Sequence, residues 1–513
     1  MNMGHGLTAK MKRIDATIAL SIFSAFLMGL ATAPISFWWL AWVALAPLWV
    51  ITVKTRSMKP AIVWGIVYHG FALHWITGLH PLMWLGVSWI ASVSIVAFAW
   101  AFITLWGAIC TGVWAWGLAR IQQNAILRVI AGTAFWCGLE LVRQWSALDW
   151  TSLAYTQSPH NLIILHLGRI SGALTVTAAI VAVNGLIAEA WLARSKRLIT
   201  SANTLCGGAI ALLIILHLIG LRLYQTSIVQ SPETKLTAGI IQGNVPTRQK
   251  LFSEGLKKAL DGYSAGYRSL VAQDVDFVVT PEGALPFLWQ GENLRNSVTQ
   301  AILEKRVLAL IGTFVPEGTR YTQSLIAIAP DGSTIARYNK IKLVPLGEYL
   351  PFEKLLGGFI GRLSPIETFL IPGDFKQQFE TPFGRIAIGI CFDSAFSEVF
   401  RRQVADQAQF LITASNLDPY STVLMAQHEA HDIIRAIETD RWAVRVTNTG
   451  YSGIVDPHGR VKWRSRNNLY EVHVDTIYRQ QSQTLYVKWG DWLTPTLLGT
   501  STVLLFLVSR NQR

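Results

Sequence analysis

The segment Arg385-Ile-Ala-Ile-Gly-Ile-Cys391-Phe-Asp393 identifies the fold class of the C-terminal half of the chain. Its short apolar run predicts a buried β-strand, and a thiol and a carboxylate follow where the run ends. Further apolar runs of this kind lie at 237–243, 276–280, 307–312, 324–329 and 410–414, and amphipathic stretches lie near 251–272, 292–305 and 425–441. Strands that alternate with helices predict an α/β layered domain in which helices cover the sheet faces.

The rest of the chain is far more apolar. Hydrophobic residues make up 51% of the 513 residues and charged residues only 15%, which is too apolar for a purely soluble protein. Runs of about 20 apolar residues can cross the roughly 30 Å hydrocarbon core of a bilayer. We expect spans at 14–35, 37–53, 60–79, 85–118, 126–143, 168–192, 203–222 and 490–508. The chain is therefore predicted to be an integral membrane protein with an α-helical bundle of about eight spans.

Basic residues predict the orientation of these spans. Clusters of Lys and Arg lie at 10–13, 54–59, 120–128, 194–197 and 510–513, and they alternate with loops that are almost free of Lys and Arg. Cytoplasmic loops of membrane proteins carry the excess of positive charge, so both termini are expected in the cytoplasm. This topology predicts a seven-span membrane region at 1–222, an extracytoplasmic domain at 223–489, and a last span with a short cytoplasmic tail at 490–513.

Charge and cysteine content argue against several function classes. Many of the basic residues behind the net charge of +13 lie in loops between spans, and no basic groove motif with interleaved aromatics is present, so nucleic-acid binding is not expected. The four cysteines show no paired spacing, which argues against disulfides and a zinc site. His428-Glu-Ala-His431 is one residue short of the His-Glu-x-x-His zinc motif and indicates a surface or site-adjacent helix. We expect no metal and no cofactor.

Three strand ends carry groups that can act together in catalysis. Glu282 follows one apolar run, Lys340 and Glu348 follow another, and Cys391 ends the segment quoted above. A thiolate attacks carbonyl carbon, a carboxylate can remove the thiol proton, and an ammonium can stabilise the resulting anions. Taken singly, such residues are usually a core cysteine, a turn glutamate and a solvated lysine. Their shared setting at strand ends predicts a Glu–Lys–Cys acyl-transfer site.

These segments resemble the nitrilase superfamily, and specifically its membrane-bound branch, the apolipoprotein N-acyltransferases. The resemblance rests on Thr280-Pro-Glu282-Gly, Tyr338-Asn-Lys340, Leu343-Val-Pro-Leu-Gly-Glu348-Tyr and Gly389-Ile-Cys391-Phe-Asp393. It extends to Gln242-Gly-Asn, Arg435-Ala-Ile-Glu, Asn448-Thr-Gly and the spans on both sides of the domain. The resemblance implies a nitrilase-like αββα sandwich for residues 223–489.

The resemblance also implies a reaction and a location. Cys391 would take a fatty acyl chain from a membrane phospholipid, typically phosphatidylethanolamine, and hold it as a thioester. The chain would then pass to the N-terminal α-amino group of a diacylglyceryl-cysteine on an apolipoprotein, the last step of lipoprotein maturation. Glu282 would act as the base and Lys340 would stabilise the oxyanion. The implied location is the bacterial cytoplasmic (inner) membrane, with the catalytic domain on its periplasmic or outer face.

Residues near the triad are expected to support catalysis or bind substrate. Glu348 would orient Lys340 or stabilise the intermediate, and Asp393 would support the site from a position where the family usually has Glu. The candidate substrate-binding residues are Asn416, Tyr420, Arg435, Trp289 and Phe252. Leu417-Asp-Pro-Tyr420 departs from the family pattern, and so does Phe252, which lies where Trp is common. These departures concern the fit of the acyl chain or the acceptor and leave the triad intact.

Two other functions remain open from the residues alone. A membrane-tethered amide or nitrile hydrolase would use the same triad with water as the acceptor, and the sequence does not show whether water reaches the thioester. A multi-span transporter or scaffold with an inactive enzyme-like domain would not need the triad. The intact triad argues against that third function, as do the few charges within the spans and the lack of an obvious inverted repeat.

Overall fold

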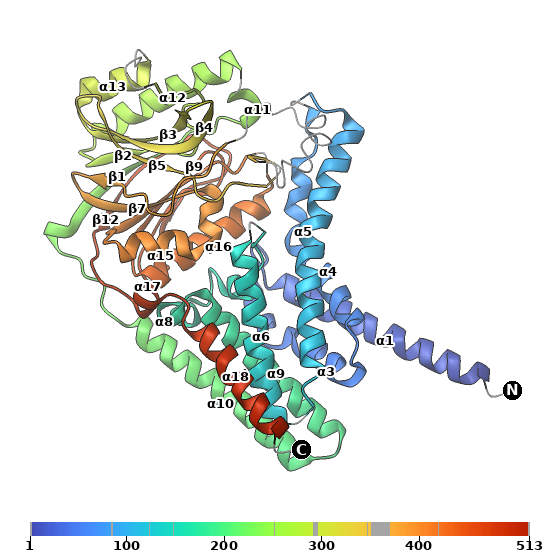
Figure 1. The fold of residues 1–513 in the computed structure, drawn as a ribbon. Coiled ribbons are helices and arrows are strands. Elements are labelled where there is room, and N and C mark those ends of the chain that lie inside the picture. The colour runs from blue at the N-terminus through green and yellow to red at the C-terminus, as the bar shows by residue number, and fades with distance from the viewer. Residues whose placement is uncertain are drawn as a thin grey trace. The chain divides into compact units, whose positions relative to one another are not determined.

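The computed structural model describes residues 3–510 apart from 84–85, 123, 147, 251, 291–295, 346, 350–369 and 419, and it describes side chains from Asp15 onward. The chain forms two compact units (Figure 1). The first comprises Met1–Thr77, Ala97–Gln225 and Asp491–Arg513, and the second comprises Gly78–Val96 and Thr226–Gly490. We describe each unit by itself.

The first unit is helical. Its helices are α1 (Met3–Leu30), α2 (Ala41–Ala44), α3 (Ala46–Thr55), α4 (Lys59–Ala72), α5 (Trp89–Leu118), α6 (Ala125–Trp145), α7 (Leu162–Leu165), α8 (Gly168–Ser171), α9 (Ala173–Ser195), α10 (Ile199–Tyr224) and α18 (Leu493–Arg510). The first part of α5, up to Val96, belongs to the second unit. Among the described residues, six helical segments are long and apolar enough to cross a membrane: Trp38–Thr55, α5, α6, α9, α10 and α18.

The helical bundle is thus confirmed, and the predicted number of about eight spans is approximate. Two of the predicted spans extend beyond the helices of the structure. Helix α1 ends at Leu30, before the predicted end at 35, and α4 ends at Ala72, where a 3-10 helix over His74–Leu79 follows. Apolar composition alone does not show where a helix ends, so the C-terminal ends of both spans were predicted too far along the chain.

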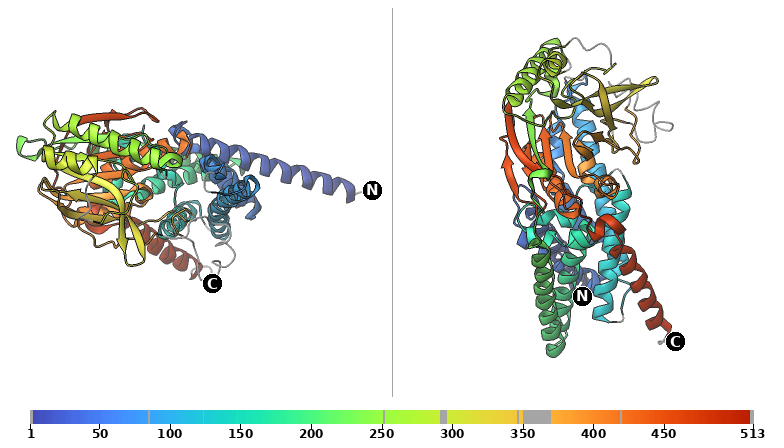
Figure 2. Two further views of the ribbon diagram at one scale, coloured as in Figure 1. Left: turned by 90° about the horizontal axis from the view of Figure 1, so that it is seen from above. Right: turned by 90° about the vertical axis from the view of Figure 1, so that its left-hand side faces the viewer.

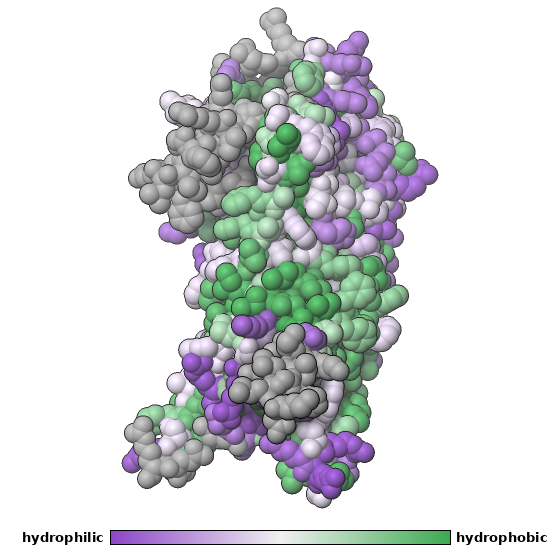
Figure 3. Space-filling model, turned by 90° about the vertical axis from the view of Figure 1, so that its right-hand side faces the viewer, coloured by the Kyte–Doolittle hydropathy of each residue, from purple (hydrophilic) through white to green (hydrophobic). Residues whose placement is uncertain are grey.

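Helix α9 forms the interior of the first unit, and most of its residues are buried. Its Asn184 side chain accepts the N–H groups of Leu45 and Ala46, both at 2.9 Å, at the start of α3. Glu189, also on α9, pairs with Arg128 at 2.6 Å. These contacts satisfy polar groups that would otherwise be costly in a bilayer. By contrast, α5 exposes Phe98, and the face of the molecule in Figure 3 carries a broad region of hydrophobic side chains.

The second unit contains two six-stranded sheets. The first has the order β12-β1-β2-β3-β4-β5, with bounds β12 (Glu471–Tyr478), β1 (Lys235–Gln242), β2 (Phe277–Val279), β3 (Leu308–Glu317), β4 (Arg320–Ile328) and β5 (Thr334–Asn339). The second has the order β11-β10-β9-β8-β7-β6, with bounds β11 (Val461–Arg464), β10 (Gly453–Val455), β9 (Ala443–Thr447), β8 (Phe410–Ser415), β7 (Gly384–Ile390) and β6 (Glu380–Thr381). Every strand expected from the apolar runs is present.

Helices cover the outer faces of both sheets, as Figures 1 and 2 show. Helices α12 (Ser253–Val271) and α13 (Ser297–Lys305) pack on the first sheet through a core that includes Tyr267, Ile302 and Ile311. Helices α15 (Ser397–Ala405) and α16 (Thr422–Thr439) lie against the second sheet. Two further helices, α11 (Thr247–Lys250) and α17 (Leu485–Trp489), are short. The rings of Phe277 and Phe410 stack between the sheets at 5.8 Å. This arrangement confirms the predicted αββα sandwich.

Parallel pairing aligns the ends of neighbouring strands within each sheet. In the first sheet β1, β2 and β3 are parallel, and in the second β7, β8 and β9 are parallel. Carboxyl ends of parallel strands meet at one edge of a sheet, which is where α/β proteins usually bind ligands. Glu282 lies just beyond β2, Cys391 directly follows β7 and Asn416 directly follows β8.

Candidate active site

Lys340 forms the centre of the site. It directly follows β5, its backbone N–H donates to the carbonyl of Gln323 at 2.8 Å, and its side chain is almost fully buried. The ammonium donates to Glu282 Oε1 at 2.9 Å and to Glu348 Oε1 at 2.6 Å. Burial opposes its charge, but the carboxylates of Glu282 and Glu348 outweigh burial and raise the pKa of Lys340 well above its ordinary value. Lys340 therefore remains a cation between two carboxylates.

Glu282 is held by contacts at both carboxylate oxygens and along its backbone. Oε1 accepts from Lys340, and Oε2 accepts the backbone N–H of Asn416 at 2.8 Å. The segment before it is fixed to β3, because the N–H of Thr280 donates to Leu310 and the Thr280 hydroxyl accepts the N–H of Gly312 at 3.1 Å. A carboxylate fixed at this strand end can accept a proton in a single, defined geometry.

Cys391 adopts a left-handed backbone conformation with φ of 49° at the point where β7 ends. Non-glycine residues rarely adopt this conformation, and they often do so at functional sites. Its Sγ lies 3.9 Å from the carbonyl oxygen of Asn416, whose N–H holds Glu282. The backbone of Asn416 thus contacts both the thiol and the carboxylate.

The electrostatics of the site favour a resting thiol. Burial, the negative charges of Glu282 and Glu348, and a hydrogen bond to Glu282 raise the pKa of Cys391, and the positive charge of Lys340 opposes them. A thiolate would therefore form when a substrate is bound and Glu282 takes the proton. This arrangement can carry out nucleophilic acyl transfer.

Glu348 and Asp393, both expected to support catalysis, occupy different environments. Glu348 Oε2 accepts the N–H of Val344 at 2.9 Å while Oε1 contacts Lys340, so its carboxylate orients the ammonium. Asp393 is fully buried and accepts the backbone N–H groups of Lys342 at 2.7 Å and Ile390 at 3.0 Å. Burial raises the pKa of Asp393 to about 6, despite these backbone donors. Asp393 therefore joins the segments that carry Lys340 and Cys391.

Two of the candidate substrate-binding residues lie at the triad. Asn416 contacts Glu282 and Cys391 through its backbone, and its side chain donates to Thr247 at 3.0 Å. Burial raises the pKa of Tyr420, and the charges of Cys391 and Glu348 raise it further, so this phenol interacts electrostatically with the triad.

The other three candidates have surroundings of their own. Trp289 is almost fully buried in the core beneath α12 and donates to Thr334 at 3.2 Å. Arg435 is buried on α16 and pairs with Glu438 at 3.2 Å. Phe252 is 60% exposed just before α12. Their binding of substrate stays a prediction.

Two residues that contact the site were not predicted. Lys250, at the end of α11, is buried and donates to the carbonyl of Gly283 at 3.0 Å, directly beside Glu282. Burial lowers the pKa of Lys250 to about 8, although Glu282 and Asp418 favour its charge. His428 contacts the carbonyl oxygen of Cys391 at 2.9 Å. The sequence offered a signal for His428, since its helix was expected at the surface or beside the site, but none for Lys250.

Comparison with known proteins gives matches over both parts of the chain. The family model of the apolipoprotein N-acyltransferase N-terminal domain matches residues 24–186, and that of carbon-nitrogen hydrolase matches residues 237–484. A protein of Nostoc sp. named apolipoprotein N-acyltransferase is 52% identical, with 92% of this chain and 96% of that protein covered. A protein of the same name from Synechocystis sp. is 40% identical, with 93% and 98% covered. Among solved structures, an amidase from Nesterenkonia sp. AN1 aligns with 15% identity and a TM-score of 0.38, covering 51% of this chain and 96% of that one.

Proposed function

Because the chain belongs to the apolipoprotein N-acyltransferase family, we propose that it moves a fatty acyl chain from a phospholipid to an apolipoprotein through a thioester on Cys391. The observation that carries this proposal is the set of contacts around Lys340, which lies between Glu282 and Glu348 beside the thiol. Such a set supplies a nucleophile, a base and a cation for the developing oxyanion. The acceptor is the α-amino group of a diacylglyceryl-cysteine.

The first half-reaction loads the enzyme. Glu282 takes the proton of the Cys391 thiol, and the thiolate attacks the ester carbonyl carbon of the phospholipid. Lys340 stabilises the negative charge on the former carbonyl oxygen in the tetrahedral intermediate. The intermediate collapses with cleavage of the bond between the carbonyl carbon and the glycerol oxygen. The protonated Glu282 gives its proton to that oxygen, so lysophospholipid leaves and the acyl chain stays as a thioester.

The second half-reaction unloads the chain. The neutral α-amino group of the lipoprotein attacks the thioester carbonyl, and Glu282 takes a proton from the attacking nitrogen. Lys340 again stabilises the oxyanion. The carbon–sulfur bond then breaks, because a thiolate is a better leaving group than an amine anion. Glu282 returns its proton to sulfur, which restores the thiol and leaves an amide on the lipoprotein.

The proposal includes a donor and a location. Phosphatidylethanolamine is the donor that the family resemblance suggests, and both substrates are membrane lipids, which accounts for a chain with six candidate spans among its described residues. We place the protein in the bacterial cytoplasmic membrane with both termini in the cytoplasm and residues 223–489 on the outer face. The distribution of basic loops supports this orientation.

One experiment tests the proposal against hydrolysis and against an inactive domain. The purified full-length protein is incubated with phosphatidylethanolamine vesicles, and the peptide that contains Cys391 is analysed by mass spectrometry. A fatty-acyl adduct that persists in buffer and moves to an added diacylated lipopeptide supports transfer. An adduct lost to water without lipopeptide indicates a hydrolase. Failure to form any adduct, with Cys391→Ala as the blank, overturns the enzymatic proposal.

A further inference from the structure

Helix α16 contacts the nucleophile through a histidine side chain. His428 lies on this helix and is almost fully buried. Its Nε2 is 2.9 Å from the carbonyl oxygen of Cys391 and 3.5 Å from the hydroxyl of Ser415. A carbonyl oxygen accepts hydrogen bonds and cannot donate them, so Nε2 carries the proton and donates to Cys391.

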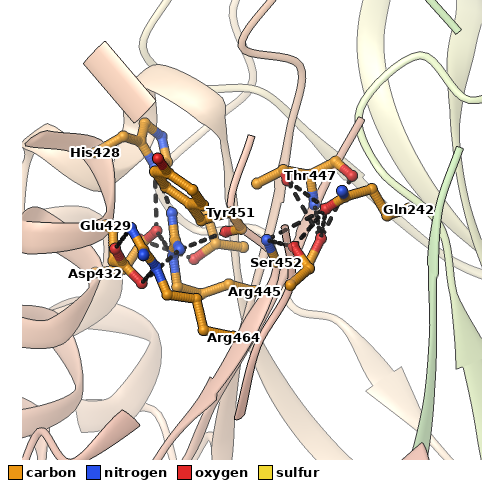
Figure 4. A network of polar contacts seen from close by, with 11 residues as sticks. Gln242, His428, Glu429, Asp432, Arg445, Thr447, Tyr451, Ser452 and Arg464 are labelled. Carbon is orange, nitrogen blue, oxygen red and sulfur yellow. Dashed lines mark hydrogen bonds and ion pairs between the residues drawn. The ribbon is translucent and has the colours of Figure 1, made fainter. Parts of the chain in front are cut away.

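The surroundings of the other ring nitrogen are compatible with a proton on Nε2. Nδ1 lies 3.2 Å from Asp432 Oδ2 and 3.3 Å from Arg445 Nη2 (Figure 4). A neutral ring can accept at Nδ1 from the Arg445 guanidinium, and a protonated ring can donate at Nδ1 to the Asp432 carboxylate. In both forms the proton on Nε2 remains directed at Cys391.

The residues around His428 are fixed in turn. Asp432 pairs with Arg445 at 2.5 Å and accepts from Thr413 on β8 at 3.1 Å. Arg445, on β9, also donates to the carbonyl of Tyr451 at 2.5 Å. Asp432 and Arg445 are almost fully buried, and Figure 4 shows this network between the helix and the sheet. Buried, mutually satisfied polar groups of this kind hold one geometry.

We propose that His428 is a positioning residue for Cys391: its Nε2–H holds the carbonyl of the nucleophile and so keeps that residue in the left-handed conformation that presents its thiol to Glu282. The proposal rests on the proposed acyl transfer through Cys391. The conformation has a φ of 49°, is unfavourable for a cysteine, and needs contacts from its surroundings. The neighbouring Ile390 is already held, since its N–H donates to Asp393, and Nε2 of His428 contacts the carbonyl of Cys391 itself.

Substitutions that keep or remove this side-chain donor test the proposal. A glutamine carries its amide nitrogen as many bonds from Cα as Nε2 of histidine, whereas the asparagine nitrogen corresponds to Nδ1. In the full-length protein, His428→Leu and His428→Asn are expected to slow formation of the Cys391 acyl adduct from phosphatidylethanolamine about tenfold to hundredfold. His428→Gln is expected to stay within about threefold of the parent rate. His473→Gln, on β12, is the control and should leave the rate unchanged.

A second readout separates this inference from the proposed function. Alkylation of Cys391 by iodoacetamide, measured on its own peptide, reports presentation of the thiol without any lipid. The ordering Gln faster than Asn and Leu, in both assays, supports positioning. Equal rates in all three variants overturn it, and so does loss of rate in step with the thermal midpoint, because that indicates a purely structural role. If the parent forms no acyl adduct, acyl transfer fails, while the alkylation ordering still decides the role of His428.

Discussion

Lys340 and Glu348 are joined by a 2.6 Å hydrogen bond, and the second oxygen of the same carboxylate accepts the backbone N–H of Val344. Both carboxylate oxygens therefore face donors. Glu348 contacts the ammonium and the chain segment at the same time, so it fixes the direction from which Lys340 approaches Glu282. Glu348 therefore acts in the site by orienting Lys340.

Replacing Glu348 by glutamine should impair the site although the side chain keeps its size. One end of the amide becomes a donor and must face either Lys340 or the N–H of Val344, both of which donate. We expect acyl-adduct formation to fall by about tenfold to hundredfold. The rate is measured by mass spectrometry of the Cys391 peptide. Glu317→Gln, which removes the carboxylate of an exposed pair with Arg337, should change nothing.

Glu282→Gln should slow both half-reactions, because each needs a proton to be removed. Loss of a general base typically costs about 10²- to 10⁴-fold in rate. Loading from phospholipid and unloading to lipopeptide are measured in separate single-turnover assays. The unloading assay starts from acyl-enzyme that has been prepared over a long incubation. Glu304→Gln, in an exposed ion pair, is the control. An unchanged rate in either half-reaction would remove Glu282 from that step.

The free energy of unfolding of the protein should depend on pH through the titration of Asp393. Burial raises its pKa to about 6, whereas an aspartate in an unfolded chain titrates near about 3.9. The folded state therefore holds the proton more tightly, and the stabilisation is present below about pH 4 and is lost as the pH rises through about 6. The asparagine of an Asp393→Asn variant does not titrate. The free energy of unfolding of the parent minus that of this variant should therefore fall by about 2 kcal/mol between about pH 4.5 and about pH 7.5.

Denaturant unfolding of the full chain in detergent at both pH values measures this difference. Asp331→Asn provides a control of opposite sign. The hydroxyl and backbone N–H of Ser333 lower the pKa of Asp331, so its stabilisation is present above the unfolded pKa and is lost as the pH falls. A stability difference for Asp393 that stays flat or rises with pH would contradict the raised pKa.

Much of this site could be predicted from sequence because strand ends are local features. The apolar runs before Glu282 and Cys391 gave the correct strands, which lie in different sheets, and the backbone of Asn416 contacts both residues. Strand β9 was not predicted, because Arg445 interrupts its apolar pattern. Its charge is tolerated inside the fold by Asp432, which comes from a different element. Pairing between distant elements is not visible in a single sequence.

Lys250 was missed for the same physical reason. Its burial is compensated by the carbonyl of Gly283, which lies far away in sequence. We expect Lys250→Met to leave that carbonyl without its ammonium donor and to slow acyl-adduct formation about tenfold. Lys258→Met, at an exposed position on α12, is the matched control. If the Lys250 variant loads at the parent rate, the contact with Gly283 has no part in orienting Glu282.

Gly312 tests how much displacement Glu282 tolerates. A methyl group at this position would lie 2.0 Å from the carbonyl oxygen of Pro281 and 3.0 Å from Glu282 Cα, both backbone atoms that cannot move aside cheaply. Gly312→Ala should therefore push the base away from Lys340, destabilise the fold by about 1–3 kcal/mol and slow acyl-adduct formation by up to about 10²-fold. Gly262 lies on α12, and a methyl group there would contact the Tyr470 ring at an ordinary distance of 3.4 Å. Gly262→Ala should therefore leave the rate unchanged. The Gly312 variant could have a lower thermal midpoint and still form the acyl adduct at the parent rate. That result would show that the contacts of Glu282 with Lys340 and Asn416 re-form after the shift. These two partners would then hold Glu282 more firmly than β3 does.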